Sequence, residues 1–243
     1  MCMRSISKQS EPAELQNWKR QMRRDAPQNL SYGNLPSDVS LSVKQALLAE
    51  QGFLCAYTMR RLRDADDCHI EHVQPQNSAP DQDLAYQNMA ACFPCNGGDV
   101  SHGYGAPVKG GQEVVLNANF VSPHSPNCEG RFLFDDKGLV SAHPHDTAAQ
   151  HTIETLRLDH RALVELRRSA MEAFGLTQGR RTTRTAHRPM SAKQASDFAR
   201  QVLQPDAKGR LEPFCVALSQ VAKAFASKEE ARAQRMKAQR LQG

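Results

Sequence analysis

Residues 69–73, His-Ile-Glu-His-Val, decide how this chain folds, together with the Cys-Phe-Pro-Cys-Asn stretch at residues 92–96. The first stretch, which follows a polar, Asp-rich loop, is expected to form a short β-strand. Successive side chains of a strand point to opposite faces, so Glu71 and His72 face opposite ways, whereas His69 and Glu71 share a face. A carboxylate and an imidazole are thereby separated for two different tasks.

These residue types suit a hydrolysis assisted by a cation. The carboxylate of Glu71 is a hard oxygen ligand, and His72 is suited to take a proton from water near neutral pH. A loop and a helix that fold back over the strand would bring Asn96 to Glu71 as a second oxygen ligand, with Asn88 holding the loop. A cation with few protein ligands keeps positions for water and a phosphate oxygen, which is typical of phosphodiester hydrolysis.

Length and composition indicate a folded protein of one or two domains. The 243 residues are 40% hydrophobic and 23% charged, and the formal net charge is +5. No stretch approaches the roughly 18 consecutive apolar residues of a membrane-spanning helix, and residues 1–14 lack the apolar core of a signal peptide. We therefore expect a cytoplasmic protein with no membrane partner, in which the seven cysteines stay reduced.

The patterns along the chain predict an α+β fold in three parts. Residues 1–52 form an N-terminal helical segment, residues 53–147 a core with accessory strands, and residues 148–243 a helical C-terminal region. Two amphipathic helices are expected in the first part, at residues 11–24 and 40–51. In the core we expect strands at residues 53–58, 69–73, 113–121 and 131–141, and a turn or short helix at residues 84–96.

The C-terminal part combines apolar side chains at helical spacing with stretches rich in Lys and Arg. Asp159 and Ser191, the latter with Gln194 in a capping box, are expected to begin two of the helices. Residues 178–189 are expected to form an exposed linker. Residues 223–243 contain six Lys or Arg against two acids. These charges either solvate a helical face or contact nucleic acid and a partner protein, and the sequence leaves both open.

The motif residues resemble a known family. Glu71 and His72, followed by Asn88 and by Cys-x-x-Cys-Asn at residues 92–96, look like the HNH, or ββα-metal, nuclease motif, with Asn in place of the last His. Over roughly residues 4–175 the chain resembles the PtuB-like HNH nucleases of Septu and retron-associated anti-phage defence systems. The finer matches lie at residues 55–57, 69–76, 86–96, 104–106, 120–129 and 132–134.

This resemblance implies an α+β fold with a ββα-metal core, and the activity of a metal-dependent endonuclease. His72 would be the general base that activates water, and Asn88 would fix the loop and orient that base. Glu71 and Asn96 would bind Mg²⁺ or Mn²⁺, with His69 as a further candidate ligand. Cleavage of DNA or RNA would leave 5′-phosphate and 3′-hydroxyl ends.

The resemblance also implies partners. Family members act with an ABC- or SMC-like ATPase as toxic effectors of prokaryotic defence, and a retron reverse transcriptase with its msDNA is a further candidate partner. Two other interpretations stay open: a catalytically idle nucleic-acid-binding or scaffold subunit, and a redox protein built on Cys92 and Cys95. The presence of both Glu71 and His72 favours the nuclease.

The sequence also departs from the family pattern. Many HNH nucleases carry two Cys-x-x-Cys pairs around a structural zinc ion, but here Thr58 stands where the partner of Cys55 is expected. Cys55, Cys92 and Cys95 remain candidate ligands of Zn²⁺, and the alternative is a thiol-lined core without metal. The basic residue that usually follows the motif is absent until Lys109, which we expect to contact phosphate.

Overall fold

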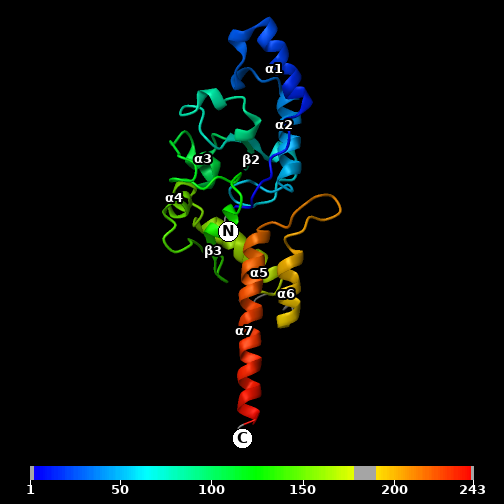
Figure 1. The fold of residues 1–243 in the computed structure, drawn as a ribbon, viewed down its shortest axis with the longest axis vertical. Coiled ribbons are helices and arrows are strands. Elements are labelled where there is room, and N and C mark those ends of the chain that lie inside the picture. The colour runs from blue at the N-terminus through cyan, green and yellow to red at the C-terminus, as the bar shows by residue number, and fades with distance from the viewer. Residues whose placement is uncertain (1–2, 178–189, 242–243) are drawn as a thin grey trace.

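The computed structural model describes residues 3–177 and 190–241 and shows a mixed α+β protein (Figure 1). Its helices are α1 (Ala13–Asp25), α2 (Ser37–Glu50), α3 (Ala106–Lys109), α4 (Thr147–Leu156), α5 (Arg161–Ala173), α6 (Ala192–Gln201) and α7 (Cys215–Leu241). Its strands are β1 (His69–His72), β2 (Met89–Cys92), β3 (Phe132–Phe134) and β4 (Val140–Ala142). The α+β class is confirmed, with helices before and after the strands.

The antiparallel β1–β2 pair carries the motif, with His72 opposite Met89. Burial alternates along β1, as its sequence predicts, whereas all four residues of β2 are buried. A short, wholly apolar run has no period-two signal. The turn or short helix expected at residues 84–96 is therefore wrong where β2 lies, although a short 3₁₀ turn at Tyr86–Asn88 leads into the strand.

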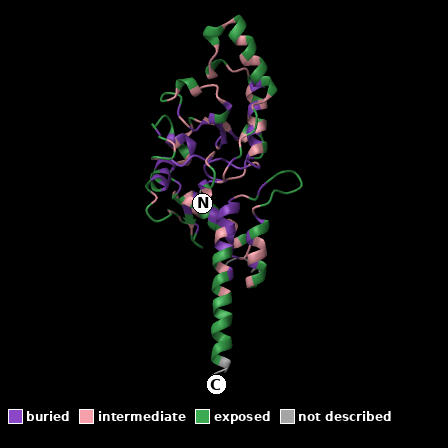
Figure 2. Cartoon of the chain, in the orientation of Figure 1, coloured by how far each residue is buried: buried purple, intermediate pink, exposed green. Residues whose placement is uncertain are grey.

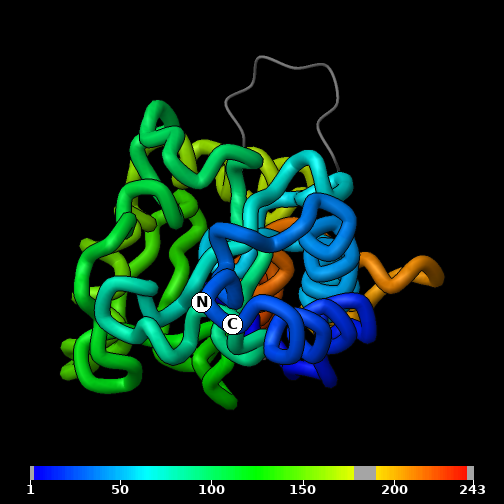
Figure 3. Tube along the Cα trace, turned by 90° about the horizontal axis from the view of Figure 1, so that it is seen from above, coloured from blue at the N-terminus to red at the C-terminus, as the bar shows by residue number. Residues whose placement is uncertain are grey.

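Two helices lie on opposite sides of this strand pair. α2 packs against it through Val43, Leu47 and Leu48, which are all buried. Figures 1 and 3 show α3 on the other side of the molecule from α2. α3 is the first α-helix after β2 and has only four residues. It ends at Lys109, whose side chain reaches β1.

Two of the expected strands are wrong. The chain turns at Gly52 and Phe53, which both have positive φ values, of 58° and 61°, and within residues 53–58 Leu54 forms only an isolated bridge, with Arg61. Residues 113–121 likewise contribute only an isolated bridge rather than a strand. In contrast, the strands expected within residues 131–141 are confirmed as the β3–β4 hairpin.

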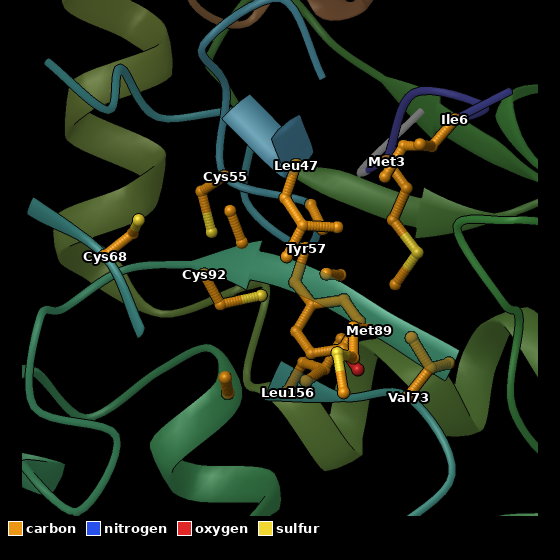
Figure 4. Close-up of a cluster of buried hydrophobic side chains, with 14 of the residues drawn as sticks. Met3, Ile6, Leu47, Cys55, Tyr57, Cys68, Val73, Met89, Cys92 and Leu156 are labelled. Atoms are coloured by element: carbon orange, nitrogen blue, oxygen red, sulfur yellow. The ribbon is translucent and has the colours of Figure 1, made fainter. Parts of the chain in front are cut away.

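Two hydrophobic clusters form the interior. The larger one joins the N-terminal helices, the strand pairs and α4, and includes Leu47, Tyr57 and Leu156 (Figure 4). The smaller one joins the end of α5 to α6 and the first part of α7. Ala226 is the last buried residue of α7 among those described, and Figure 2 shows the helix continuing away from the body as an exposed rod. The three-part division of the chain stays a prediction.

One of the two predicted helix N-caps is present in the structure. Ser191 and Gln194 form the predicted capping box of α6. The cap expected at Asp159 is wrong, since the side chain of His160 accepts from the first turn of α5 instead. The predicted linker at residues 178–189 lies outside the described residues. Within the part of the chain that the structure describes, no helix has the length and apolar character needed to cross a membrane.

Candidate active site

Glu71 lies at the centre of the site on β1. Its Oε1 atom accepts a 2.6 Å hydrogen bond from the ammonium of Lys109 and a 3.4 Å bond from the hydroxyl of Tyr57. Its Oε2 atom lies 3.7 Å from Nε2 of His69. Lys109 also donates to the backbone carbonyl of His72 over 3.0 Å, and its side chain is only 1% exposed. α3 therefore holds both the carboxylate and the end of the strand.

The charges of Glu71 and His69 support each other. Burial works to raise the pKa of Glu71, but the bond with His69 and the charge and bond of Lys109 outweigh it and leave the pKa below its usual value. For His69, burial works to lower the pKa, but the bonds to Glu71 and to the carbonyl of Pro94 leave the pKa above its usual value. Glu71 is thus a carboxylate in this site.

His69 is oriented by the loop that follows β2. Its Nδ1 atom bonds to the backbone carbonyl of Pro94, and this ring nitrogen carries a proton because a carbonyl oxygen only accepts. Gly97 lies close against the ring, where a Cβ would stand 2.9 Å from the ring carbon Cδ2. In the neutral ring the lone pair is on Nε2, which faces Glu71. Metal-binding histidines are commonly oriented in this way.

His72 lies on the other face of β1, as predicted. Its Nε2 atom is 2.8 Å from the backbone carbonyl of Asp83 and therefore carries a proton. The ring of Tyr32 stands edge-on to it, with centroids 4.7 Å apart. Burial lowers the pKa of His72 below its ordinary value, which favours the neutral ring. The lone pair is then on Nδ1, which is not among the buried side-chain atoms that lack a partner in the described part of the chain.

Asn88 fixes the loop between the two strands. Its Oδ1 atom accepts from the backbone N–H of Gln74 over 2.8 Å, and its Nδ2 atom donates to the carbonyl of the same residue over 2.9 Å. The backbone carbonyl of Asn88 accepts from the N–H of Val73 over 2.9 Å. These three bonds secure the chain directly after His72. The contact matches the loop-holding part of the role that the sequence predicts for Asn88.

The structure does not bring Asn96 into contact with Glu71, although it describes both residues. The Asn96 side chain is exposed, and its Oδ1 atom accepts from the backbone N–H of Gly98 over 3.0 Å. The donor atoms that the structure does bring together are Oε2 of Glu71 and Nε2 of His69. A ligand role for Asn96 stays a prediction.

Two residues of the site are missed or misread from the sequence. Asp83 contributes a backbone carbonyl to His72, which any residue type could supply, so no side-chain signal marks it. Lys109 is expected to contact phosphate, and this is wrong, because its ammonium is buried against Glu71. The signal that could have shown this is the preceding Ala-Pro-Val at residues 106–108, an apolar run that favours burial.

Two of the three candidate zinc ligands lie in the core. Cys55 and Cys92 are both buried there (Figure 4). Burial works to raise the pKa of Cys55, but hydrogen bonds from Cys92 and Thr58 outweigh it and lower the pKa to about 5. Burial raises the pKa of Cys92 well above its usual value. Cys95, in contrast, is exposed.

Within the described residues, no three or more His, Cys, Asp or Glu side chains are grouped as a metal site. The Zn²⁺ site and the Mg²⁺ or Mn²⁺ site therefore both stay predictions. The described cysteines are all free thiols, so Cys92 and Cys95 are not joined as the redox interpretation would have them in its oxidised form.

No protein-family model matches this chain, and no curated protein shows significant similarity to it. The class of site is therefore defined by its own geometry. That geometry combines a histidine whose one ring nitrogen is held by a carbonyl with a carboxylate on the opposite face of the same strand.

Proposed function

We propose that this chain is a metal-dependent HNH endonuclease that hydrolyses phosphodiester bonds in DNA or RNA, and that it is the toxic effector of an anti-phage complex with an ATPase. The observation that carries the proposal is the setting of His72. Its Nε2 atom is fixed by the carbonyl of Asp83, which leaves Nδ1 as the ring nitrogen that would take a proton, and Glu71 lies next to it on the strand. The resemblance of the motif to HNH nucleases supports the same conclusion.

In this proposal His72 takes a proton from the attacking water through Nδ1. The ring then carries a positive charge, which the carbonyl of Asp83 stabilises through its bond with Nε2. Asn88 keeps the following loop in place through Gln74, so the ring is held in one orientation. The backbone carbonyl of Asp83 and the side-chain amide of Asn88 keep their protonation states throughout.

The residues around Glu71 fit a divalent cation. Oxygen and nitrogen ligands lie about 2.0–2.6 Å from such ions, so one ion is able to contact two atoms that are 3.7 Å apart, as Oε2 of Glu71 and Nε2 of His69 are. The bond from Nδ1 of His69 to Pro94 is the support that such a ligand needs. Bound there, Mg²⁺ or Mn²⁺ would polarise the phosphate and stabilise the leaving oxygen.

Structural Zn²⁺ is a separate proposal with less support. Cys55 and Cys92 would supply two thiolates, and Cys95 would have to turn inward as a third ligand. A structural zinc site has four ligands.

A second candidate function is favoured by one observation. Lys109 already neutralises Glu71, which is the state expected of a catalytically idle subunit that keeps the fold in order to bind nucleic acid. Such a subunit would bind DNA or RNA but would leave it intact in the presence of Mg²⁺.

One experiment separates the two candidates. The purified full chain, alone and with the proposed ATPase partner, is incubated with plasmid, single-stranded DNA and total tRNA in Mg²⁺, in Mn²⁺ and in EDTA. We expect cleavage in Mg²⁺ or Mn²⁺ that EDTA abolishes, with 5′-phosphate and 3′-hydroxyl products. Binding without cleavage under every condition would establish the idle subunit, and cleavage that persists in EDTA would reject the metal-dependent mechanism.

A further inference from the structure

Lys109 is the most deeply buried charge next to the candidate active site. Its ammonium lies 2.6 Å from Oε1 of Glu71 and 3.0 Å from the carbonyl of His72, and its side chain is 1% exposed. The short helix that carries it is held by the N–H of Gly105, which donates to the carbonyl of Leu156 on α4 over 2.8 Å. The ammonium is thus a fixed part of the site and cannot swing into solvent as a surface lysine does.

Lys109 determines the net charge of the side chains at the proposed cation site. Glu71 is the one carboxylate in contact with Lys109 and His69 among the described residues, and its negative charge is cancelled by Lys109. With a neutral His69 these three side chains carry no net charge, so a divalent cation between Glu71 and His69 would find no net negative charge and would lie close to the ammonium of Lys109. Like charges at such short range repel strongly in a partly buried site.

We propose that Lys109 is a resident counter-ion that makes divalent-cation binding at Glu71 depend on a nucleic-acid phosphate. This inference rests on the proposed function and adds a regulation of the same site. Each phosphate brings a negative charge that offsets Lys109, and Mg²⁺ sites with one or two carboxylates commonly complete their ligands with substrate phosphate. Lys109 acts through Glu71 and touches no reacting atom, so it is a positioning residue.

The dependence must run in both directions. If a phosphate strengthens cation binding by some factor, the cation strengthens nucleic-acid binding by the same factor. The chain would then hold its metal weakly when it is free and strongly on nucleic acid. For a nuclease that is toxic when active, this keeps the free chain without its metal.

The test measures binding of Mn²⁺ rather than cleavage. All proteins carry His72→Ala, so that nucleic acid stays intact, and free Mn²⁺ is followed by electron paramagnetic resonance. Each protein is titrated alone, with a short DNA duplex and with a short RNA. Lys109→Met is compared with Lys109→Gln, which keeps a hydrogen-bond donor, and with Lys8→Met. Lys8 is a matched control, because it forms a buried ion pair with Glu50, 2.9 Å long, outside the site.

We expect Lys109→Met and Lys109→Gln to bind Mn²⁺ about tenfold or more tightly than the parent when no nucleic acid is present. In the parent we expect DNA or RNA to strengthen Mn²⁺ binding by about tenfold or more, and in both Lys109 variants by clearly less. Lys8→Met should behave as the parent does. The Glu71→Gln variant lacks the proposed carboxylate ligand. The Mn²⁺ that is bound in its presence therefore gives the background from nucleic acid alone.

Three outcomes of the Mn²⁺ titrations would overturn this inference. Equal Mn²⁺ affinity in the parent and in a folded Lys109 variant overturns the role of Lys109. A parent whose Mn²⁺ affinity does not respond to DNA or RNA overturns it too, and this result does not require that any Lys109 variant folds. If Glu71→Gln binds as much Mn²⁺ as the parent under all conditions, Glu71 is not a ligand, and the proposed metal site fails along with the inference.

Discussion

Asn88 shows what a single amide contributes to this site. It bonds to both backbone groups of Gln74 and is 6% exposed. Asn88→Ala leaves the N–H and carbonyl of Gln74 without these partners, and we expect the free energy of unfolding to fall by about 1–3 kcal/mol. Urea denaturation measures the change. The neighbouring Gln87→Ala is the control, since Gln87 is exposed and should change stability by about 0.5 kcal/mol or less.

His124 links stability to pH. Burial lowers its pKa to about 4, and its Nε2 atom is one of the buried side-chain atoms without a partner in the described residues. In the unfolded chain the pKa returns to about 6.5. As pH falls below about 6.5, the unfolded state therefore binds a proton that the folded state does not, and stability is lost down to about pH 4.

We therefore expect His124→Gln to reduce the acid sensitivity of folding. The free energy of unfolding of the wild type should drop between about pH 7.5 and pH 5 by about 2 kcal/mol more than that of the variant, since one pKa unit corresponds to about 1.4 kcal/mol. Urea denaturation at both pH values measures this difference. An equal drop in the two proteins would mean that His124 titrates normally in the folded state.

The residues of the candidate site differ in how far the sequence could predict them. Glu71, His72 and Asn88 were accessible because their side chains carry the chemistry and their spacing forms a motif. Asp83 was not, because it acts through its backbone. For Lys109 the sequence predicts a contact with phosphate, but its pairing with Glu71 depends on how α3 packs, and this long-range contact leaves no local pattern.

At the scale of elements, Arg167 joins α5 to the β3–β4 hairpin. It is 1% exposed and donates to the carbonyls of Gly138 over 2.8 Å and Leu158 over 2.7 Å. Arg167→Met removes both donors from a buried position, so we expect a loss of about 2–4 kcal/mol in the free energy of unfolding. Arg168→Met is the matched control, because the Arg168 side chain is 48% exposed. Equal effects of the two variants in thermal and urea melts would contradict this role of Arg167.

Elements that depend on residues close in sequence can be predicted, whereas elements that depend on distant contacts cannot. The capping box at Ser191 and the turn that joins β3 to β4 depend on residues close in sequence. β2 is a wholly buried apolar run whose strand state depends on pairing with β1. Residues 53–58 carry apolar side chains that favour a strand, but the positive φ of Phe53 turns the chain there.

At the scale of the whole molecule, the described residues of α7 after Ala226 form a long segment with no buried side chain. Figure 1 shows it projecting from the body. Lys228, Arg232 and Arg235 recur at helical spacing and share one face, and all three are exposed. The basic residues between positions 178 and 189 lie outside the described residues. We propose that this face of α7 contacts the ATPase partner or a nucleic-acid backbone.

Removing residues 227–243 tests this role. Among the described side chains of α7 the last buried one is Ala226, so the thermal melting temperature should change little. Co-purification with the ATPase, or the salt dependence of DNA binding, should weaken, because log K falls by about 0.9 per neutralised phosphate for each decade of salt. If complex formation and the salt slope both keep their wild-type values, the exposed helix only solubilises the chain.

The proposed nuclease activity depends most directly on His72. His72→Ala removes the group that takes the proton, and we expect the rate of nucleic-acid cleavage in Mg²⁺ to fall by about 10² to 10⁴. The control is His151→Ala, because His151 is exposed on α4. Thermal melts of the same preparations verify that each variant is folded. A folded His72→Ala protein that cleaves as fast as the wild type would contradict the account.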